Sequence, residues 1–183
     1  MKKQVLFIQG GGDNGYQADA ALVKSLQEGL GENYEILYPQ IPSNDDAPDF
    51  GWPEQIGEQI ASLKDGFVLV AHSLGASMLL KYISENEARF KTAGIFLLAA
   101  PFWSGNEAWK QGIKLCEDFA RQLPKNSRFF FYHCKDDKEV PFDHLEQYRQ
   151  NLPGATFREI ETGGHQFGGR INLVAIDIKN LYI

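Results

Sequence analysis

Several features are scarce or missing in this chain of 183 residues, and each absence excludes a class of protein. There are only two cysteines, Cys116 and Cys134, too few for a disulfide framework, which favours a reducing compartment. Basic runs are missing and the formal net charge is −6, which argues against nucleic acid or an anionic membrane as partner. No apolar segment is long enough for a membrane span or a signal peptide. We therefore expect a cytoplasmic protein.

Short apolar runs and helical patterns alternate along the rest of the chain. The runs predict six strands, at residues 4–9, 34–38, 66–71, 92–99, 128–134 and 156–161. The helical patterns predict helices between and after them, at residues 17–30, 54–64, 74–87, 113–123, 142–151 and 171–181.

This alternation predicts an α/β protein with three layers, α/β/α, around a mostly parallel six-stranded sheet. Some strands, such as 92–99, are apolar without interruption, as expected when helices cover both faces of the sheet. The length predicts that residues 1–183 form a single domain. Ligands of such sheets bind outside the carboxyl ends of the strands, so the loops after the strands are candidate walls of a site.

The most informative of these loops lies within residues 67–77. An apolar strand ends at residues 71–75 (Ala-His-Ser-Leu-Gly), and a helical pattern follows at once. Strand, sharp turn and helix are the context of a nucleophile elbow, whose strained turn lifts a serine hydroxyl above the strand ends. Ala71 stands where the usual G-x-S-x-G pattern has its first glycine. The simpler alternative is that Ser73 only caps the helix.

Two later loops carry the groups that could activate Ser73. The fifth strand is followed by Asp136 and Asp137, and the sixth by His165. Histidine can take the serine proton near neutral pH and return it to a leaving group, and a carboxylate orients the imidazole. The chain order Ser, Asp, His is the order found in α/β-hydrolases, and two aspartates compete for the middle position.

Residues 71–75, residues 133–141 and the pair Gly164-His165 together resemble the α/β-hydrolase superfamily. The short length resembles the small serine hydrolases related to retinoblastoma-binding protein nine. The resemblance covers essentially the whole chain and implies an α/β-hydrolase fold. Only a short loop follows the fourth strand, where many relatives insert a lid domain, so no lid is expected.

The resemblance also implies roles for individual residues. Ser73 and His165 match the nucleophile and the base. In that family the acid lies three residues before a Val-Pro pair, a position that Asp137 occupies here. By the same match, the backbone N–H groups of Gly11 and Leu74 would form an oxyanion hole, each donor being worth roughly 3 kcal/mol. One departure is Cys134, where the family commonly has glycine.

Aromatic residues on loops after the strands could line a substrate pocket. We expect Trp52, Phe102 and Trp103 to line it, and Phe50 and Trp109 lie on such loops as well. No His, Cys and Asp grouping has the spacing of a zinc site, and neither a metal nor an organic cofactor is implied.

Two histidines next to the predicted site have simpler interpretations, as does a third on a helix. His72 is expected to be a packed or hydrogen-bonded scaffold residue, and His133 a structural one. His144 has charged neighbours on a predicted helix and is expected to be solvated. Cys134 is expected to be a buried, inert thiol.

The sequence thus predicts a serine hydrolase that cleaves carboxylic esters, thioesters or activated amides of a small-molecule acyl substrate through an acyl-serine intermediate. The first alternative is a hydrolase-like protein-interaction module with weak catalysis. The second is nucleotide binding, because residues 10–15 match G-x-G-x-x-G. That match is weak, since no acidic residue ends the second predicted strand to bind a ribose.

Overall fold

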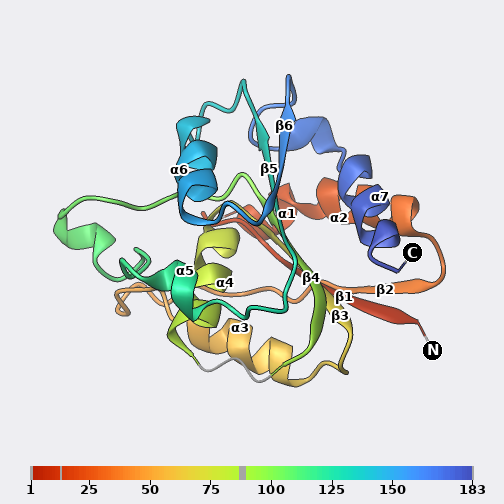
Figure 1. The fold of residues 1–183 in the computed structure, drawn as a ribbon, viewed down its shortest axis with the longest axis horizontal. Coiled ribbons are helices and arrows are strands. Elements are labelled where there is room, and N and C mark those ends of the chain that lie inside the picture. Colours follow the sequence, from red (N-terminus) through yellow and green to blue (C-terminus); the bar gives the residue numbers. More distant parts are fainter. Residues whose placement is uncertain (1, 13, 87–89, 183) are drawn as a thin grey trace.

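The computed structural model describes residues 2–12, 14–86 and 90–182. Its centre is a six-stranded sheet in the order β2-β1-β3-β4-β5-β6, in which each strand runs parallel to its neighbours (Figure 1). The predicted strands are confirmed as β1 (Lys3–Ile8), β2 (Tyr34–Leu37), β3 (Phe67–His72), β4 (Thr92–Leu98), β5 (Phe129–Cys134) and β6 (Thr156–Ile160).

Helices cover both faces of the sheet, so the predicted three layers are confirmed (Figure 1). The helices are α1 (Gly15–Ala18), α2 (Ala20–Leu30), α3 (Trp52–Ala61), α4 (Ser73–Glu85), α5 (Phe119–Gln122), α6 (Asp143–Asn151) and α7 (Asn172–Asn180). Buried side chains of α2 and α7 pack on one face, and those of α3, α4, α5 and α6 on the other. The predicted helix end at position 87 lies outside the described residues.

The strand sequences explain this two-sided cover. Successive side chains of a strand point to opposite faces of the sheet. In β3, Phe67, Leu69 and Ala71 belong to the core beneath α3 and α4, whereas Val68 and Val70 belong to the core beneath α2 and α7. Both faces are buried, so the strand is apolar from Phe67 to Ala71.

The predicted helix at residues 113–123 is too long, because only Phe119–Gln122 within it is α-helical. The chain instead forms a 3₁₀ helix at Ala108–Lys110, then turns, and only then the short α5. The carbonyl of Lys114 accepts a hydrogen bond from Lys81 Nζ (3.4 Å), and Gly112 lies so close to Pro48 that a Cβ there would be 1.8 Å from the Pro48 carbonyl oxygen. Tertiary contacts of this kind override the local helical spacing.

The strand order reverses between β1 and β3, because the chain leaves β1 toward β2 on one side and continues from β3 toward β4 on the other. The loops after β1 and β3 therefore diverge, which leaves a crevice at the carboxyl ends of these strands. No lid domain is inserted after β4, in agreement with the prediction. Among the described helices, none combines the length and the apolar character needed to cross a bilayer.

Candidate active site

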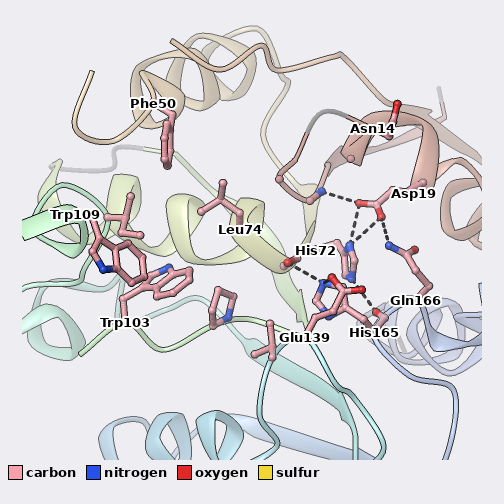
Figure 2. A pocket seen from close by; sticks show the side chains of 18 residues that line it. Asn14, Asp19, Phe50, His72, Leu74, Trp103, Trp109, Glu139, His165 and Gln166 are labelled. Atoms are coloured by element: carbon pink, nitrogen blue, oxygen red, sulfur yellow. Dashed lines mark hydrogen bonds and ion pairs between the residues drawn. The ribbon is translucent and has the colours of Figure 1, made fainter. Parts of the chain in front are cut away.

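A cavity of about 590 Å³ opens at this crevice (Figure 2), and Ser73 is among the residues that line it. One wall is apolar and includes Phe50, Leu74, Trp103 and Trp109. The opposite wall carries polar groups, among them Asn14, Asp19, His165 and Gln166. A molecule held in this cavity would therefore meet two chemically different surfaces on either side of the serine.

The turn at Ser73 has the strand–turn–helix form that the sequence predicts. Ser73 is the first residue of α4 and has a φ of 50°, in the left-handed region that side chains other than glycine rarely adopt. Gly75 allows the tight fold of helix on strand, because a Cβ there would lie 2.1 Å from the carbonyl oxygen of Gln9. Two other residues that follow strands, Ala99 and Phe167, and Phe50 in the apolar wall also have positive φ. Among these residues of the described chain, Ser73 and Phe50 line the cavity itself, so part of the backbone strain lies at the site.

The structure brings Ser73, His165 and Asp137 together. His165 Nε2 is 2.9 Å from Ser73 Oγ, and His165 Nδ1 is 2.9 Å from Asp137 Oδ2. The other oxygen of Asp137 accepts the backbone N–H groups of Glu139 (2.9 Å) and Val140 (3.0 Å).

These hydrogen bonds determine the charge of Asp137 and the tautomer of His165. Burial raises the pKa of Asp137, but the hydrogen bonds from His165 and from the N–H groups of Val140 and Glu139 outweigh it and hold the pKa below its ordinary value. Ionised Asp137 can only accept, so His165 Nδ1 donates to it. Nε2 of the neutral ring is then left to accept the proton of the Ser73 hydroxyl.

Asp136 points elsewhere. Its carboxylate accepts the N–H groups of Gly163 (3.1 Å) and Gly164 (2.8 Å). The hydrogen bonds from Gly164 and Gly163 hold the pKa of Asp136 below its ordinary value. Asp136 therefore anchors the loop that carries His165, whereas Asp137 contacts the imidazole itself.

Gly11 and Leu74 meet at the cavity, as the oxyanion prediction requires. Both line it, and a Cβ on Gly11 would lie 2.7 Å from Leu74 Cδ2. Leu74 is in the first turn of α4, where N–H groups have no partner within the helix and the helix dipole favours negative charge.

A second Asp–His pair, Asp19 with His72, lies beside the first. His72 Nδ1 is 2.9 Å from Asp19 Oδ1, and His72 Nε2 is 3.0 Å from the carbonyl oxygen of His165. The prediction that His72 is a hydrogen-bonded scaffold residue is confirmed. Sequence reasoning missed Asp19, which lies at the break between α1 and α2. The available signal was a charge at helical spacing from Leu22 and Leu26, on the apolar face of the predicted helix.

Of the three predicted pocket residues, Trp103 lies at the cavity and the other two do not. Trp103 Nε1 donates to Ser77 Oγ (3.2 Å), and its ring meets that of Trp109 edge to face. Trp52 is instead buried in the core, a correction explained by its place in α3, whose apolar face packs on the sheet. Phe102 is also corrected, because it is not among the residues that line the cavity and its ring packs on aromatic core residues, Phe119 and Tyr148.

The remaining predictions concern His133, His144 and Cys134. His133 is buried and its Nε2 donates to the carbonyl of Val140 (2.9 Å), which supports a structural role. The prediction of a solvated His144 is wrong, because it is half-buried and its Nδ1 accepts the N–H of Phe102 (3.0 Å). Cys134 is buried as predicted, and burial raises the pKa of its thiol to about 12, so it is unreactive. The described residues contain no group of three or more acidic, histidine or cysteine side chains placed to hold a metal ion.

A family model described as "Serine hydrolase" matches residues 36–167, which is more than half of the chain. No curated protein sequence matches.

Many solved structures have a similar fold. The ydeN gene product from B. subtilis is 18% identical with a TM-score of 0.65, over 100% of this chain and 99% of that one. The esterase domain of a Rhodothermus marinus protein is 12% identical with a TM-score of 0.67, over 97% of this chain and 85% of that one. A mutant of the meta-cleavage product hydrolase CumD is 12% identical with a TM-score of 0.75, over 98% and 92% of the two chains. At such low identity these likenesses show the fold alone.

Proposed function

This chain belongs to the serine hydrolase family within the α/β-hydrolase superfamily, and from that premise we propose that it cleaves carboxylic esters through an acyl-serine intermediate. Thioesters and activated amides would react by the same steps. The observation that carries the proposal is the chain of two 2.9 Å contacts from Ser73 through His165 to Asp137, in which Ser73 and His165 line the cavity. Residues 1–183 would act as one catalytic domain.

In the first half of the proposed reaction, Ser73 Oγ attacks the acyl carbonyl and its proton moves to His165 Nε2. Asp137 stabilises the imidazolium that forms, because its carboxylate faces Nδ1 at 2.9 Å. The N–H groups of Gly11 and Leu74 would stabilise the negative oxygen of the tetrahedral intermediate. His165 then gives its proton to the leaving alcohol, the C–O bond breaks, and an acyl-Ser73 remains.

In the second half, water takes the place of the alcohol. His165 removes a proton from the water as it attacks the acyl carbon, and the same donors stabilise the second tetrahedral intermediate. Collapse of this intermediate returns the proton to Ser73 and releases the acid. Every proton is shuttled by His165, so no metal or redox cofactor takes part in these steps.

The apolar wall of the cavity suggests the kind of acyl group. Leu74, Trp103 and Trp109 offer aliphatic and aromatic surface on one side of the cavity that Ser73 lines. Burial of a CH₂ group is worth about 0.8 kcal/mol, so each added methylene that reaches this wall improves binding. We expect an apolar acyl chain on this side, with the alcohol on the polar side near His165.

The test combines a series of p-nitrophenyl esters of increasing acyl length with labelling by a fluorophosphonate probe. Wild-type protein should hydrolyse the esters and react with the probe, and Ser73→Ala should do neither. Ser62→Ala is the matched control, because it makes the same change at an exposed serine at the end of α3. Full activity in Ser73→Ala, or an inert wild-type protein, would refute the proposal.

A further inference from the structure

The buried pair Asp19 and His72 has no assigned role in the reaction proposed above, yet it lies against it. The two side chains are 0% and 1% exposed, and the His72 ring is centred 4.7 Å from the ring of His165. Burying a charged or polar group is costly unless all its hydrogen bonds are made. The burial of Asp19 and His72 at this position therefore needs a structural or catalytic explanation.

Counting donors and acceptors shows how the pair is bonded. The carbonyl oxygen of His165 can only accept, so His72 Nε2 must carry a hydrogen and donate to it. The Asp19 carboxylate receives the N–H of Gly10 (2.7 Å), the Nε2 amide of Gln166 (3.1 Å) and Nδ1 of His72 (2.9 Å). The two donors other than His72 reach different oxygens of Asp19, which is the pattern of a carboxylate. The proton between Asp19 and His72 is therefore placed on His72 Nδ1.

These contacts join three separate loops. Gly10 precedes Gly11 in the loop after β1, His72 precedes Ser73 at the end of β3, and Gln166 follows His165 in the loop after β6 (Figure 2). Each partner is thus the chain neighbour of a group that we assign to the reaction. Gln166 keeps its contact with Asp19 even though its buried Oε1 has no partner within the described residues, which is an unfavourable arrangement.

We propose that Asp19 and His72 are positioning residues: one buried ion pair that sets the oxyanion donor, the nucleophile and the base relative to one another. This inference rests on the proposed function. The pair acts through the backbone of its neighbours rather than on the substrate. Misplacement of a reacting group by about 1 Å can cost on the order of 100-fold in rate, so the pair should affect turnover more than binding.

The test is Asp19→Asn, which keeps the size of the side chain and removes its charge. We expect kcat for a short ester to fall about 10- to 100-fold with KM little changed, because the acyl wall lies on the other side of the cavity. The rate of fluorophosphonate labelling of Ser73 should fall in parallel, measured well below the melting temperature of the variant.

Asp177→Asn is the matched control. Asp177 is also buried and charged, but it is held by Tyr132 and Arg158 and does not line the cavity. The Asp177→Asn variant should have a lower melting temperature than the wild-type protein, with kcat and fluorophosphonate labelling unchanged. If Asp19→Asn behaves in the same way, its role is structural only and the inference is overturned.

A milder variant covers the case in which Asp19→Asn does not fold. Gln166→Ala removes one donor to Asp19 and leaves the ion pair, so it should show the same loss of kcat and labelling at smaller size, and unchanged kcat would overturn the inference. Wild-type protein that neither hydrolyses esters nor reacts with the probe would instead refute the proposed function, and the inference with it. Active wild-type protein with an unaffected Asp19→Asn variant refutes the inference alone.

Discussion

Two Asp–His pairs lie side by side in this molecule, and the group that the far nitrogen of each imidazole faces differs between them. The side chains of Asp137 and Asp19 are both 0% exposed, and those of their partners His165 and His72 are 8% and 1% exposed. In both pairs a carboxylate faces Nδ1 of the imidazole. The far nitrogen of His165 faces the hydroxyl of Ser73, whereas that of His72 faces a backbone carbonyl.

The comparison shows that residue type, burial and an Asp partner do not make a histidine a base. A ring nitrogen that faces a carbonyl must keep its proton, and one that faces a hydroxyl can accept one. By this criterion His165 can do proton transfer and His72 can only hold structure. The experiments below would break or sharpen this distinction.

The largest effect is expected at the acid of the first pair. Asp137→Asn keeps the shape but favours the wrong imidazole tautomer, a change that costs about 10⁴ in kcat in the serine protease precedent. Asp136→Asn should be far milder, because Asp136 contacts only backbone N–H groups of the loop. The measurement is kcat for both variants on one ester at neutral pH, after circular dichroism confirms folding. If Asp136→Asn is the more damaged variant, our assignment of the acid is wrong.

The second effect separates stability from activity. His72→Ala leaves the buried Asp19 charge without its counter-ion, which should lower the free energy of unfolding by roughly 3–5 kcal/mol. His165→Ala should abolish turnover but cost less stability, because the His165 side chain is more exposed than that of His72 (8% against 1%). Asp137 also keeps His133 Nε2 at 3.5 Å besides its two backbone N–H donors. Urea unfolding of both variants measures the difference. Equal losses of stability would contradict the distinction between a holding pair and a reacting pair.

A third, smaller effect concerns acid pH. Because the pKa of Asp137 is held below its ordinary value in the folded protein, its charge contributes stability above the unfolded pKa of about 3.9. That contribution is lost as the pH falls through the lower folded value. The difference in unfolding free energy between wild-type protein and Asp137→Asn should therefore shrink below about pH 4, measured by urea titrations across that range. A difference that grows with acidity would show that burial, not hydrogen bonding, dominates at this carboxyl.

The smallest effect is expected at Glu139, a carboxylate near His165 that belongs to neither pair. Its Oε2 is 3.7 Å from His165 Nε2, but the side chain is 73% exposed, so solvent and salt screen the interaction. Glu139→Gln should change kcat by less than about five-fold, and the change should vanish at high salt. A loss as large as that of Asp137→Asn would mean that this exposed carboxylate, rather than Asp137, orients the base.

Local sequence patterns predict the strands and the turn at Ser73, because both depend on residues that are close together in the chain. Short strand-forming segments between helical patterns predict all six strands, and the turn at Ser73 is predicted because strand, turn and helix follow one another directly. Asp19 was missed because its partners are far away in the chain, His72 by 53 positions and Gln166 by 147. Trp52 and Trp103 are both aromatic residues near predicted loops, and only the packing of α3 and the hydrogen bond to Ser77 separate core from cavity.

The left-handed backbone around the cavity has a consequence for the engineering of heat tolerance. Each such non-glycine residue costs about 1–3 kcal/mol, a large share of a total stability of about 5–15 kcal/mol. Selection for thermostability alone should therefore favour replacements at Ser73 and Ala99, where glycine or asparagine would relax the chain. Selection that also demands turnover should retain the serine and find its gains elsewhere. Two parallel libraries would test this, one screened for thermostability alone and one also for hydrolysis of a substrate. The melting temperatures of the best variants with and without Ser73 would measure how much stability the strained turn costs.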